Sequence, residues 1–281
     1  MNELQALLLG VVQGLTEFLP ISSSGHLILV PWLLDFHYLE QHPDFNKTFD
    51  VALHAGTLVA VLVYFRTELL AYGRGFLRTL HTRRVETEDE RMAWLIALAT
   101  LPAAAVGAAA ETTIEDKLGQ PWQIAILLAV FGILLGLADR LPQRREMSGL
   151  GWRGALTIGF AQAVALAPGT SRSGITITAA RALGLTRRAA ARFSFLLLAP
   201  ITFGAVLYEG VDLAATGVPA GAEGPFVVGI VAAAASGFAA MWWMLRYLQT
   251  HSYDIFVVYR VVVAVVVVGL IATGVQSATF E

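Results

Sequence analysis

Six stretches of this chain are apolar over enough residues to cross a membrane as helices. A helix that spans the hydrocarbon core needs about 20 mostly apolar residues, and polar segments separate the six stretches from one another. The pattern therefore predicts six transmembrane helices. Their approximate bounds are Phe49–Phe65, Met92–Ala110, Trp122–Ala138, Phe193–Tyr208, Phe226–Leu245 and Ile255–Gly274.

Two further apolar stretches, Leu4–Leu34 and Gly154–Leu183, are interrupted by proline, glycine and serine. The interruptions read P-I-S-S-S-G-H at 20–26 and P-G-T-S-R-S-G at 168–174. Because proline and glycine break helices, each stretch predicts a re-entrant helix–loop–helix hairpin that enters the membrane and returns. Non-helical backbone is stable inside the hydrocarbon core only where protein or water covers it. We therefore expect the two loops to face each other and to line a polar cavity.

The two interruptions are copies of one motif at an offset of 149 residues. At this offset Gly10 matches Gly159, Gln13 matches Gln162, Ser22 matches Ser171 and Ser24 matches Ser173. A duplicated, glycine-broken segment in corresponding halves of a hydrophobic protein points to a site near the bilayer midplane. Since three spans follow each hairpin, we expect an all-α integral membrane fold with an inverted-topology repeat. The whole chain, 1–281, is then a single membrane domain with repeats of about 1–138 and 150–275.

The basic residues indicate how the spans are oriented. All but four of the 19 lysines and arginines fall in four polar segments, which the alternation of spans places on one side of the membrane. By the positive-inside rule this side is cytoplasmic, so the first hairpin opens from the outer face and the second from the cytoplasm. The four segments are Arg66–Arg91, which we interpret as a loop, Arg140–Arg153, Arg181–Arg192 and Arg246–Asp254.

Composition agrees with a membrane protein and excludes some chemistry. The chain is 56% hydrophobic and 14% charged, whereas soluble domains carry about 25% charged residues. It has no cysteine, which excludes disulfides, thiolate nucleophiles and cysteine-ligated metal sites.

Charged and titratable groups inside the hairpins are the candidates for function, because charge is costly in a bilayer and usually functional there. Glu17 lies four residues after Gln13, so the two share a helix face. His26 follows the first serine run. Arg172 lies in the second motif, and its planar guanidinium suits phosphate oxygens. A serine nucleophile needs a neighbouring base and electrostatic stabilisation of the charge that develops. Ser22–Ser24 supply hydroxyls next to His26 and, across the cavity, Glu17.

Structural explanations compete with these roles. Glu17 and Arg172 could form an ion pair, which is compatible with function in the ligand-free state. His26 could be a packing residue, and serine runs also serve as helix N-caps.

Two pairs of polar residues outside the hairpins are weaker candidates. Asp50 and His54 are four apart and could form a polar seam, although packing or support of a neighbouring group explains them better. Arg260 with Tyr259 is best explained as structural.

The two motifs resemble a known family. The segment Q-G-L-T-E-F-L-P-I-S-S-S-G-H at 13–26 resembles the first signature of bacterial undecaprenyl pyrophosphate phosphatases, the bacitracin-resistance family, and 168–174 resembles the second. The resemblance spans the whole chain and includes F-D-V-A-L at 49–53. It implies hydrolysis of undecaprenyl pyrophosphate to the monophosphate on the outer face of the bacterial inner membrane. This reaction recycles the lipid carrier of cell-wall precursors and confers bacitracin resistance.

The resemblance also implies roles for single residues. Ser23 falls on the proposed nucleophile and Arg172 on the phosphate-binding arginine, while Glu17 and His26 are the remaining catalytic residues. The residues expected to bind substrate are Gln13, Ser22, Ser24, Thr170, Ser171, Ser173 and Gly174. Members are described as depending on Mg²⁺ or Ca²⁺. Many have glutamate where this chain has Gln13, so a metal role rests on Glu17, which suits Mg²⁺ because it often bridges phosphates with one or two carboxylates.

Other functions remain to be separated from this one. A lipid flippase or transporter uses the same inverted repeats and broken helices, and fold alone does not exclude it. A likeness to phosphatidic acid phosphatases is rejected, since their lysine-led arginine motif is missing and neither Lys47 nor Lys117 precedes Arg-Pro. The expected partners are a polyprenyl pyrophosphate lipid and the bilayer, without nucleic acid, and a homodimer is left open.

Overall fold

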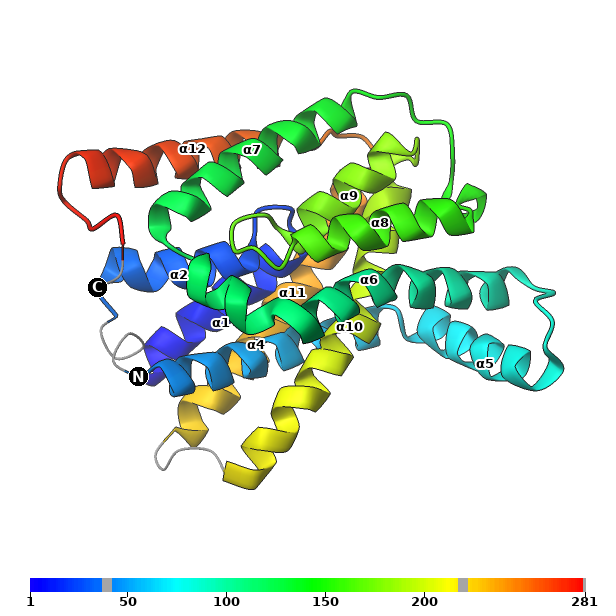
Figure 1. The fold of residues 1–281 in the computed structure, drawn as a ribbon, viewed down its shortest axis with the longest axis horizontal. Helices are drawn as coiled ribbons and strands as arrows, with labels where there is room; N and C mark the ends of the chain where they lie inside the picture. The colour runs from blue at the N-terminus through cyan, green and yellow to red at the C-terminus, as the bar shows by residue number, and fades with distance from the viewer. Residues whose placement is uncertain (37–41, 217–221, 280–281) are drawn as a thin grey trace.

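The computed structural model describes residues 1–36, 42–216 and 222–279. Within these residues the chain forms eleven α-helices, one 3₁₀ turn (Met147–Gly149) and no β-strand (Figure 1). The helices are α1 (Glu3–Phe18), α2 (Ser23–Leu34), α4 (Pro43–Tyr64), α5 (Arg66–Thr82), α6 (Glu88–Lys117), α7 (Pro121–Asp139), α8 (Trp152–Val164), α9 (Arg172–Ala182), α10 (Arg187–Thr216), α11 (Glu223–Tyr247) and α12 (Asp254–Ala272).

Among the described residues, six helices are long and apolar enough to cross a membrane. Each overlaps one of the six predicted stretches, so the all-helical membrane fold with six spans is confirmed. The helix–loop–helix pairs are α1–α2 and α8–α9. Their return within the bilayer and the inversion of the repeat stay predictions. The six apolar portions are Phe45–Tyr64, Glu88–Ala110, Pro121–Asp139, Arg187–Tyr208, Glu223–Tyr247 and Asp254–Ala272.

The charges of Arg66–Arg91 predict a loop, and this prediction is wrong. The first 17 residues form α5, and a short turn connects it to α6. The segment folds because it is amphipathic: Tyr72, Gly75 and Thr79 recur at helical spacing and are buried, while the arginines lie on the remaining faces.

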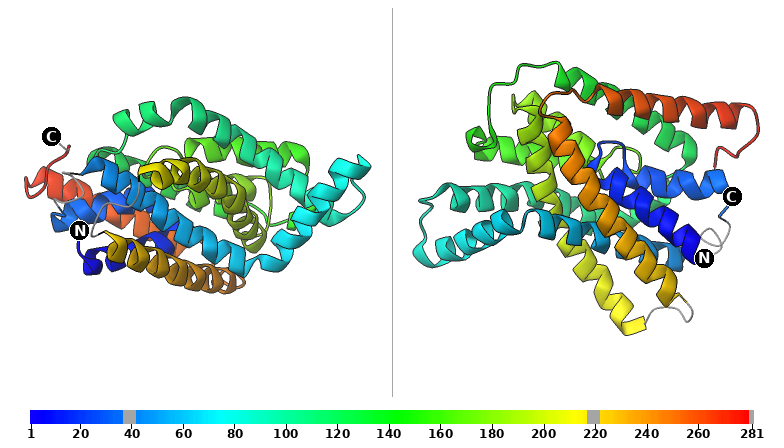
Figure 2. Two further views of the ribbon diagram at one scale, coloured as in Figure 1. Left: turned by 90° about the horizontal axis from the view of Figure 1, so that it is seen from below. Right: turned by 180° about the vertical axis from the view of Figure 1, so that it is seen from behind.

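Helices of the first half of the chain pack against helices of the second half. α1, the first helix of the first hairpin, lies against α11, and α8, the first helix of the second hairpin, lies against α6 (Figures 1 and 2). In addition α4 packs against α10, and α7 packs against α12. In the order of the chain, α1 corresponds to α8, α4 to α10, α6 to α11 and α7 to α12. The contact of α1 with α11 is therefore repeated by the contact of α8 with α6. The other two contacts each join a helix to its own counterpart. A duplicated chain is expected to pack in this way.

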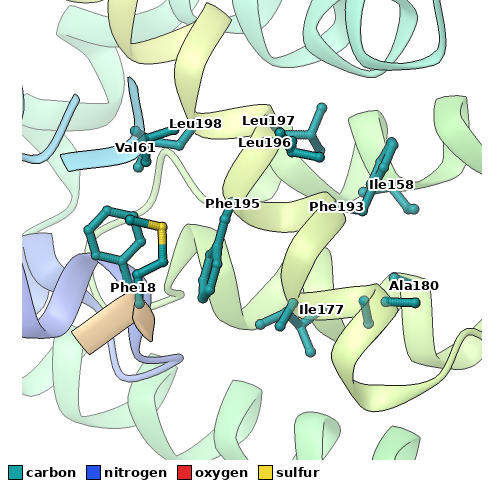
Figure 3. Packing of buried hydrophobic residues seen from close by; sticks show 14 of the residues in the cluster. Phe18, Val61, Ile158, Ile177, Ala180, Phe193, Phe195, Leu196, Leu197 and Leu198 are labelled. Atoms are coloured by element: carbon teal, nitrogen blue, oxygen red, sulfur yellow. The ribbon is translucent and has the colours of Figure 1, made fainter. Parts of the chain in front are cut away.

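The core of the molecule is built around α10. Phe193, Phe195 and Leu196–Leu198 are fully buried, and Figure 3 shows them among residues of neighbouring helices such as Phe18 and Ile177. The ring of Phe195 contacts that of Phe18 edge-on, with 5.4 Å between centroids. Because Phe18 ends α1, this contact fixes the position of the first helix break against α10.

A glycine lets α1 approach α11 closely. A Cβ added at Gly14 would overlap the Ser236 hydroxyl and would lie 2.6 Å from the Gly237 nitrogen. Real Cβ atoms do not come this close to backbone, so only glycine fits here. Gly14 adjoins Gln13, and Glu17 follows on the same helix, so the close crossing also sets where those side chains lie.

We expect Gly14→Ala to destabilise the protein by about 1–3 kcal/mol, because overpacking a tight contact displaces backbone or side chains. Thermal unfolding of the purified protein in detergent measures this as a lower Tm. Gly73→Ala is the matched control: it lies on α5 with nothing within 4 Å of its added Cβ, and alanine favours a helix over glycine. An unchanged Tm for Gly14→Ala would contradict the proposed close crossing.

Candidate active site

The two helix breaks have the same local conformation. Ser22 and Ser171 are the N-caps of α2 and α9, with φ of 79° and 75°. A positive φ is rare for any residue except glycine, so its recurrence at matched positions indicates a shared, built turn. Each serine hydroxyl accepts a hydrogen bond from the amide three residues on, Gly25 N at 3.3 Å and Gly174 N at 3.0 Å. The first residues of the two helices are therefore Ser23 and Arg172, which are equivalent at the 149-residue offset.

The two breaks touch each other, as predicted. The Gly169 amide donates to the Ser22 hydroxyl at 3.1 Å, and the Ser173 hydroxyl donates to the Leu19 carbonyl at 3.2 Å. A Cβ on Gly25 would lie only 3.3 Å from the Gly169 Cα. Glycine at these two positions thus allows the loops to meet backbone to backbone.

Arg260 of α12 forms hydrogen bonds with both breaks and with α7. Its side chain is fully buried, and its guanidinium donates only to backbone carbonyls in the described residues. The acceptors are Leu127 O (3.3 Å), Leu128 O (2.9 Å), Pro20 O (3.1 Å), Gly169 O (3.0 Å) and Thr170 O (3.0 Å). Carbonyls outside helices need donors when buried, and the arginine fork supplies them. The structural role predicted for Arg260 is confirmed.

Glu17 is the centre of the polar cluster. It is 5% exposed, and four donors surround its carboxylate. Oε2 accepts from Ser23 Oγ at 2.6 Å and from Gln13 Nε2 at 3.2 Å. Oε1 accepts from Arg172 Nη2 at 3.0 Å and Nε at 3.3 Å. These bonds compensate the loss of hydration that a buried carboxylate suffers.

Arg172 connects the site to the core. Besides its two bonds to Glu17, Nη1 donates to the Ser194 carbonyl of α10 at 2.8 Å. The ion pair considered from the sequence is therefore present. Three of the five guanidinium N–H groups are used, which leaves one on each terminal nitrogen without an acceptor among the described residues. With 15% of its side chain exposed, Arg172 can offer these two donors to an anion.

His26 lies three residues after Ser23 in the first turn of α2 and is 7% exposed. Its Nδ1 donates to the Ser22 carbonyl at 2.7 Å, so in the neutral ring Nε2 accepts the Tyr259 hydroxyl proton at 2.8 Å. The Tyr259 ring also stacks on the imidazole, with 5.6 Å between centroids. Both nitrogens of His26 are thus engaged by the protein, and its catalytic role stays a prediction.

The residues predicted to bind substrate surround this cluster, and several also build the loops. Ser22 and Ser171 are N-caps, Ser173 Oγ lies 3.3 Å from Ser171 Oγ, and Ser24 Oγ lies 3.5 Å from Ser22 Oγ. A Cβ on Gly174 would lie 2.9 Å from Arg260 Nη1. The Thr170 hydroxyl is buried without a partner in the described residues. Their contacts with substrate stay predictions.

His54 of α4 is a site residue that the sequence left among the weaker candidates. Its Nε2 lies 3.8 Å from Glu17 Oε2, and its side chain is 34% exposed. Nδ1 donates to the Asp50 carbonyl one turn earlier at 2.8 Å. The spacing of Asp50 and His54 indicated a shared face of a helix. It carried no information about which helix that face would meet.

This arrangement can transfer a phosphoryl group. The Ser23 hydroxyl is hydrogen-bonded to a carboxylate that can take its proton. Arg172 and the N-termini of α2 and α9 lie beside it, and helix N-termini attract anions through their free amides and dipoles. A nucleophile, a base and an anion site therefore meet at one point.

Comparison with known proteins gives one consistent match. The family model described as bacitracin resistance protein BacA matches residues 6–266. Similar proteins named undecaprenyl-diphosphatase occur in several bacteria. That of Pelobacter propionicus is 44% identical over 99% of this chain and 100% of its own. That of Thermomicrobium roseum is 46% identical over 95% and 97%, and that of Geobacter sulfurreducens is 47% identical over 92% and 95%.

We expect Arg260→Met to lower stability by about 3–5 kcal/mol, because it leaves buried carbonyls of both breaks without donors. Thermal unfolding in detergent measures the loss. Arg144→Met is the control, since Arg144 is exposed and its side chain forms no hydrogen bond or ion pair with the described residues. Equal Tm values for the two variants would show that Arg260 does not hold the breaks together.

Proposed function

Because the chain belongs to the family of bacitracin resistance protein BacA, we propose that it hydrolyses undecaprenyl diphosphate to undecaprenyl phosphate and inorganic phosphate. The family and the enzyme class predicted from the two motifs are confirmed. The family model spans most of the chain, and the relatives matched over nearly their full length share the name undecaprenyl-diphosphatase. Recycling of the carrier lipid for cell-wall synthesis and bacitracin resistance follow from the family.

The hydrogen bond of 2.6 Å between Ser23 and Glu17, beside Arg172, is the observation that carries the mechanism. A flippase needs an anion site but no activated hydroxyl. Since the relatives carry the name of a hydrolase and the site contains a nucleophile with its base, the flippase alternative is not favoured.

The isoprenoid tail and the diphosphate of the substrate bind in different surroundings. The isoprenoid tail stays in the bilayer, where the spans present apolar side chains. The diphosphate lies over the N-termini of α2 and α9, with its terminal phosphate within reach of Ser23. The two remaining N–H groups of Arg172 bind phosphate oxygens, and the guanidinium offsets the charge that builds up during transfer.

The reaction proceeds in two displacements. Ser23 Oγ attacks the terminal phosphorus, the bond from that phosphorus to the bridging oxygen breaks, and undecaprenyl phosphate leaves. Glu17 takes the serine proton as the P–O bond forms. Water then attacks the phosphoserine, inorganic phosphate leaves, and the proton returns to Ser23. His26 holds the turn that presents the serine, through its bond to the Ser22 carbonyl.

A divalent cation, Mg²⁺ or Ca²⁺, fits the donors beside Glu17. Gln13 Oε1 is buried and has no hydrogen-bond partner in the described residues, and it is a hard oxygen ligand next to a carboxylate. Mg²⁺ commonly combines one or two protein oxygens with phosphate oxygens and water, so Glu17 and Gln13 would hold it. When bound, the cation supplies charge neutralisation at the diphosphate.

The family supports our proposal for the membrane, and the charge pattern supports our proposal for the face of the site. We place the chain in the bacterial inner membrane, with the arginine-rich segments in the cytoplasm and the first hairpin open to the outer face. This orientation matches a substrate whose diphosphate is exposed on the outer side.

Ser23→Ala should lower phosphate release on the order of 10³-fold or more, because it removes the hydroxyl that forms the covalent intermediate. Arg172→Ala should lower it about 10²–10³-fold through lost charge stabilisation. Phosphate release from undecaprenyl diphosphate by the purified protein in detergent measures both. Unchanged melting shows that the variants are folded, and exposed Ser148→Ala and Arg144→Ala are the controls.

A Ser23→Ala enzyme that keeps most of its rate would mean that water attacks the phosphorus directly. Near-normal turnover by Arg172→Ala would refute the role assigned to the arginine. A wild-type protein that releases no phosphate would favour the transporter.

Chelation of divalent cations should abolish turnover, and Mg²⁺ or Ca²⁺ should restore it. Gln13→Leu should raise the half-saturating cation concentration on the order of tenfold, since it removes one oxygen ligand of two. Gln13→Glu should lower that concentration. Full activity in the presence of the chelator, or an unchanged half-saturating cation concentration for Gln13→Leu, would contradict a cation site at Glu17 and Gln13.

A further inference from the structure

One face of α5 is apolar and exposed. Leu70, Leu77 and Leu80 are 57%, 67% and 54% exposed, and their spacing places them on one side of the helix. Large exposed apolar surfaces mark places where a protein meets another molecule or a membrane. Figure 1 shows α5 at the end of the molecule opposite the two termini, beside the first turns of α6.

The opposite face of α5 is fixed against α6, so the direction of the leucines is determined. A Cβ on Gly75 would lie 3.2 Å from the Glu90 Cα. The Phe76 and Trp94 rings are 4.9 Å apart, and Trp94 Nε1 donates to the Thr79 hydroxyl at 2.8 Å. α5 cannot turn its leucines inward without breaking these contacts.

Three arginines around this face have no acidic partner. Within the described residues the acids of the hairpin are largely engaged by other cations: Glu86 and Glu90 with Arg78, Glu88 with Arg91, and Glu68 with Arg192. Arg74, Arg83 and Arg84 are exposed and form no ion pair with the described part of the chain. The leucine face is therefore bordered by three arginines that form no ion pair with the described residues, and Asp89 is the one acid of this hairpin that is likewise in none.

An open surface hollow of about 380 Å³, which we call the cavity, lies at the tip of this hairpin. It combines guanidinium groups that bind phosphate with apolar and aromatic walls. Trp94, 40% exposed, is a residue type that concentrates at membrane interfaces. The lining residues are Thr79, Leu80, Arg83, Arg84, Val85 and Trp94.

We propose that α5 and this cavity form a binding site for an anionic phospholipid, separate from the catalytic site. The phosphate headgroup lies at Arg83 and Arg84, and the acyl chains follow Leu80, Leu77 and Leu70. A helix with arginines beside a leucine face lies in the interface of a bilayer and prefers anionic lipids. The hairpin belongs to the arginine-rich side of the protein, so the site faces the cytoplasmic leaflet.

Native mass spectrometry of the purified full chain, titrated with phosphatidylglycerol or phosphatidylcholine, tests the site without using turnover. We expect tighter binding of phosphatidylglycerol to the wild type. The double variant Arg83→Gln/Arg84→Gln should bind it on the order of tenfold more weakly. Arg144→Gln/Arg145→Gln removes the same charge from another exposed loop and should bind as the wild type does. Matching Tm values without lipid show that both are folded.

Substitution of the leucines separates a lipid from a soluble phosphate. Leu70→Ser/Leu77→Ser should weaken binding of phosphatidylglycerol, because the acyl chains lose their contact. The proposal is overturned if both arginine variants lose affinity equally, or if phosphatidylcholine binds as tightly. It is also overturned if Leu70→Ser/Leu77→Ser keeps its oligomeric state and binds phosphatidylglycerol as tightly as the wild type, because the acyl chains would then not follow the leucines. A change of oligomeric state in the leucine variant, with lipid binding intact, would assign the face to a second copy.

Discussion

The site depends on the hydrogen bonds that Arg260 donates to carbonyls of both helix breaks. Backbone that leaves the helix inside a membrane must find partners within the protein, since the hydrocarbon offers none. One buried guanidinium provides them for Pro20 of the first break and for Gly169 and Thr170 of the second. The breaks are consequently held at one place, and they position Ser23 and Arg172, which begin the helices that follow them.

The candidate active site contains two turns of the same conformation whose side chains differ. Ser23 and Arg172 begin α2 and α9 at equivalent positions, and each follows a serine cap with positive φ. Glu17 has Leu166 as its counterpart at the same offset. One copy therefore carries the proposed nucleophile and base, and the other carries the proposed anion-binding group. Duplication gives the convergence of two helix N-termini, and divergence of a few side chains gives the reaction.

The sequence was sufficient to predict the six spans, the two breaks and the meeting of Glu17, Ser23 and Arg172, because hydropathy and the repeated motif are local signals. It did not reveal α5, since a search for apolar stretches passes over an amphipathic helix rich in arginine. The bond from Tyr259 to His26 joins residues 233 positions apart. No local pattern encodes such a contact; only the packing of α12 beside the first hairpin does. The same holds for His54 beside Glu17.

The ion pair between Glu17 and Arg172 does not have to break before substrate binds. Arg172 uses Nε, one N–H of Nη2 and one of Nη1 within the protein, and its two other N–H groups remain for a phosphate. Glu17 can thus keep the arginine oriented while its other oxygen holds the Ser23 proton. Electrostatic catalysis is most effective when the charges are already in place before the reaction. In the proposed mechanism, the bonds seen without ligand are therefore the ones that orient the groups for phosphoryl transfer, and they do not compete with it.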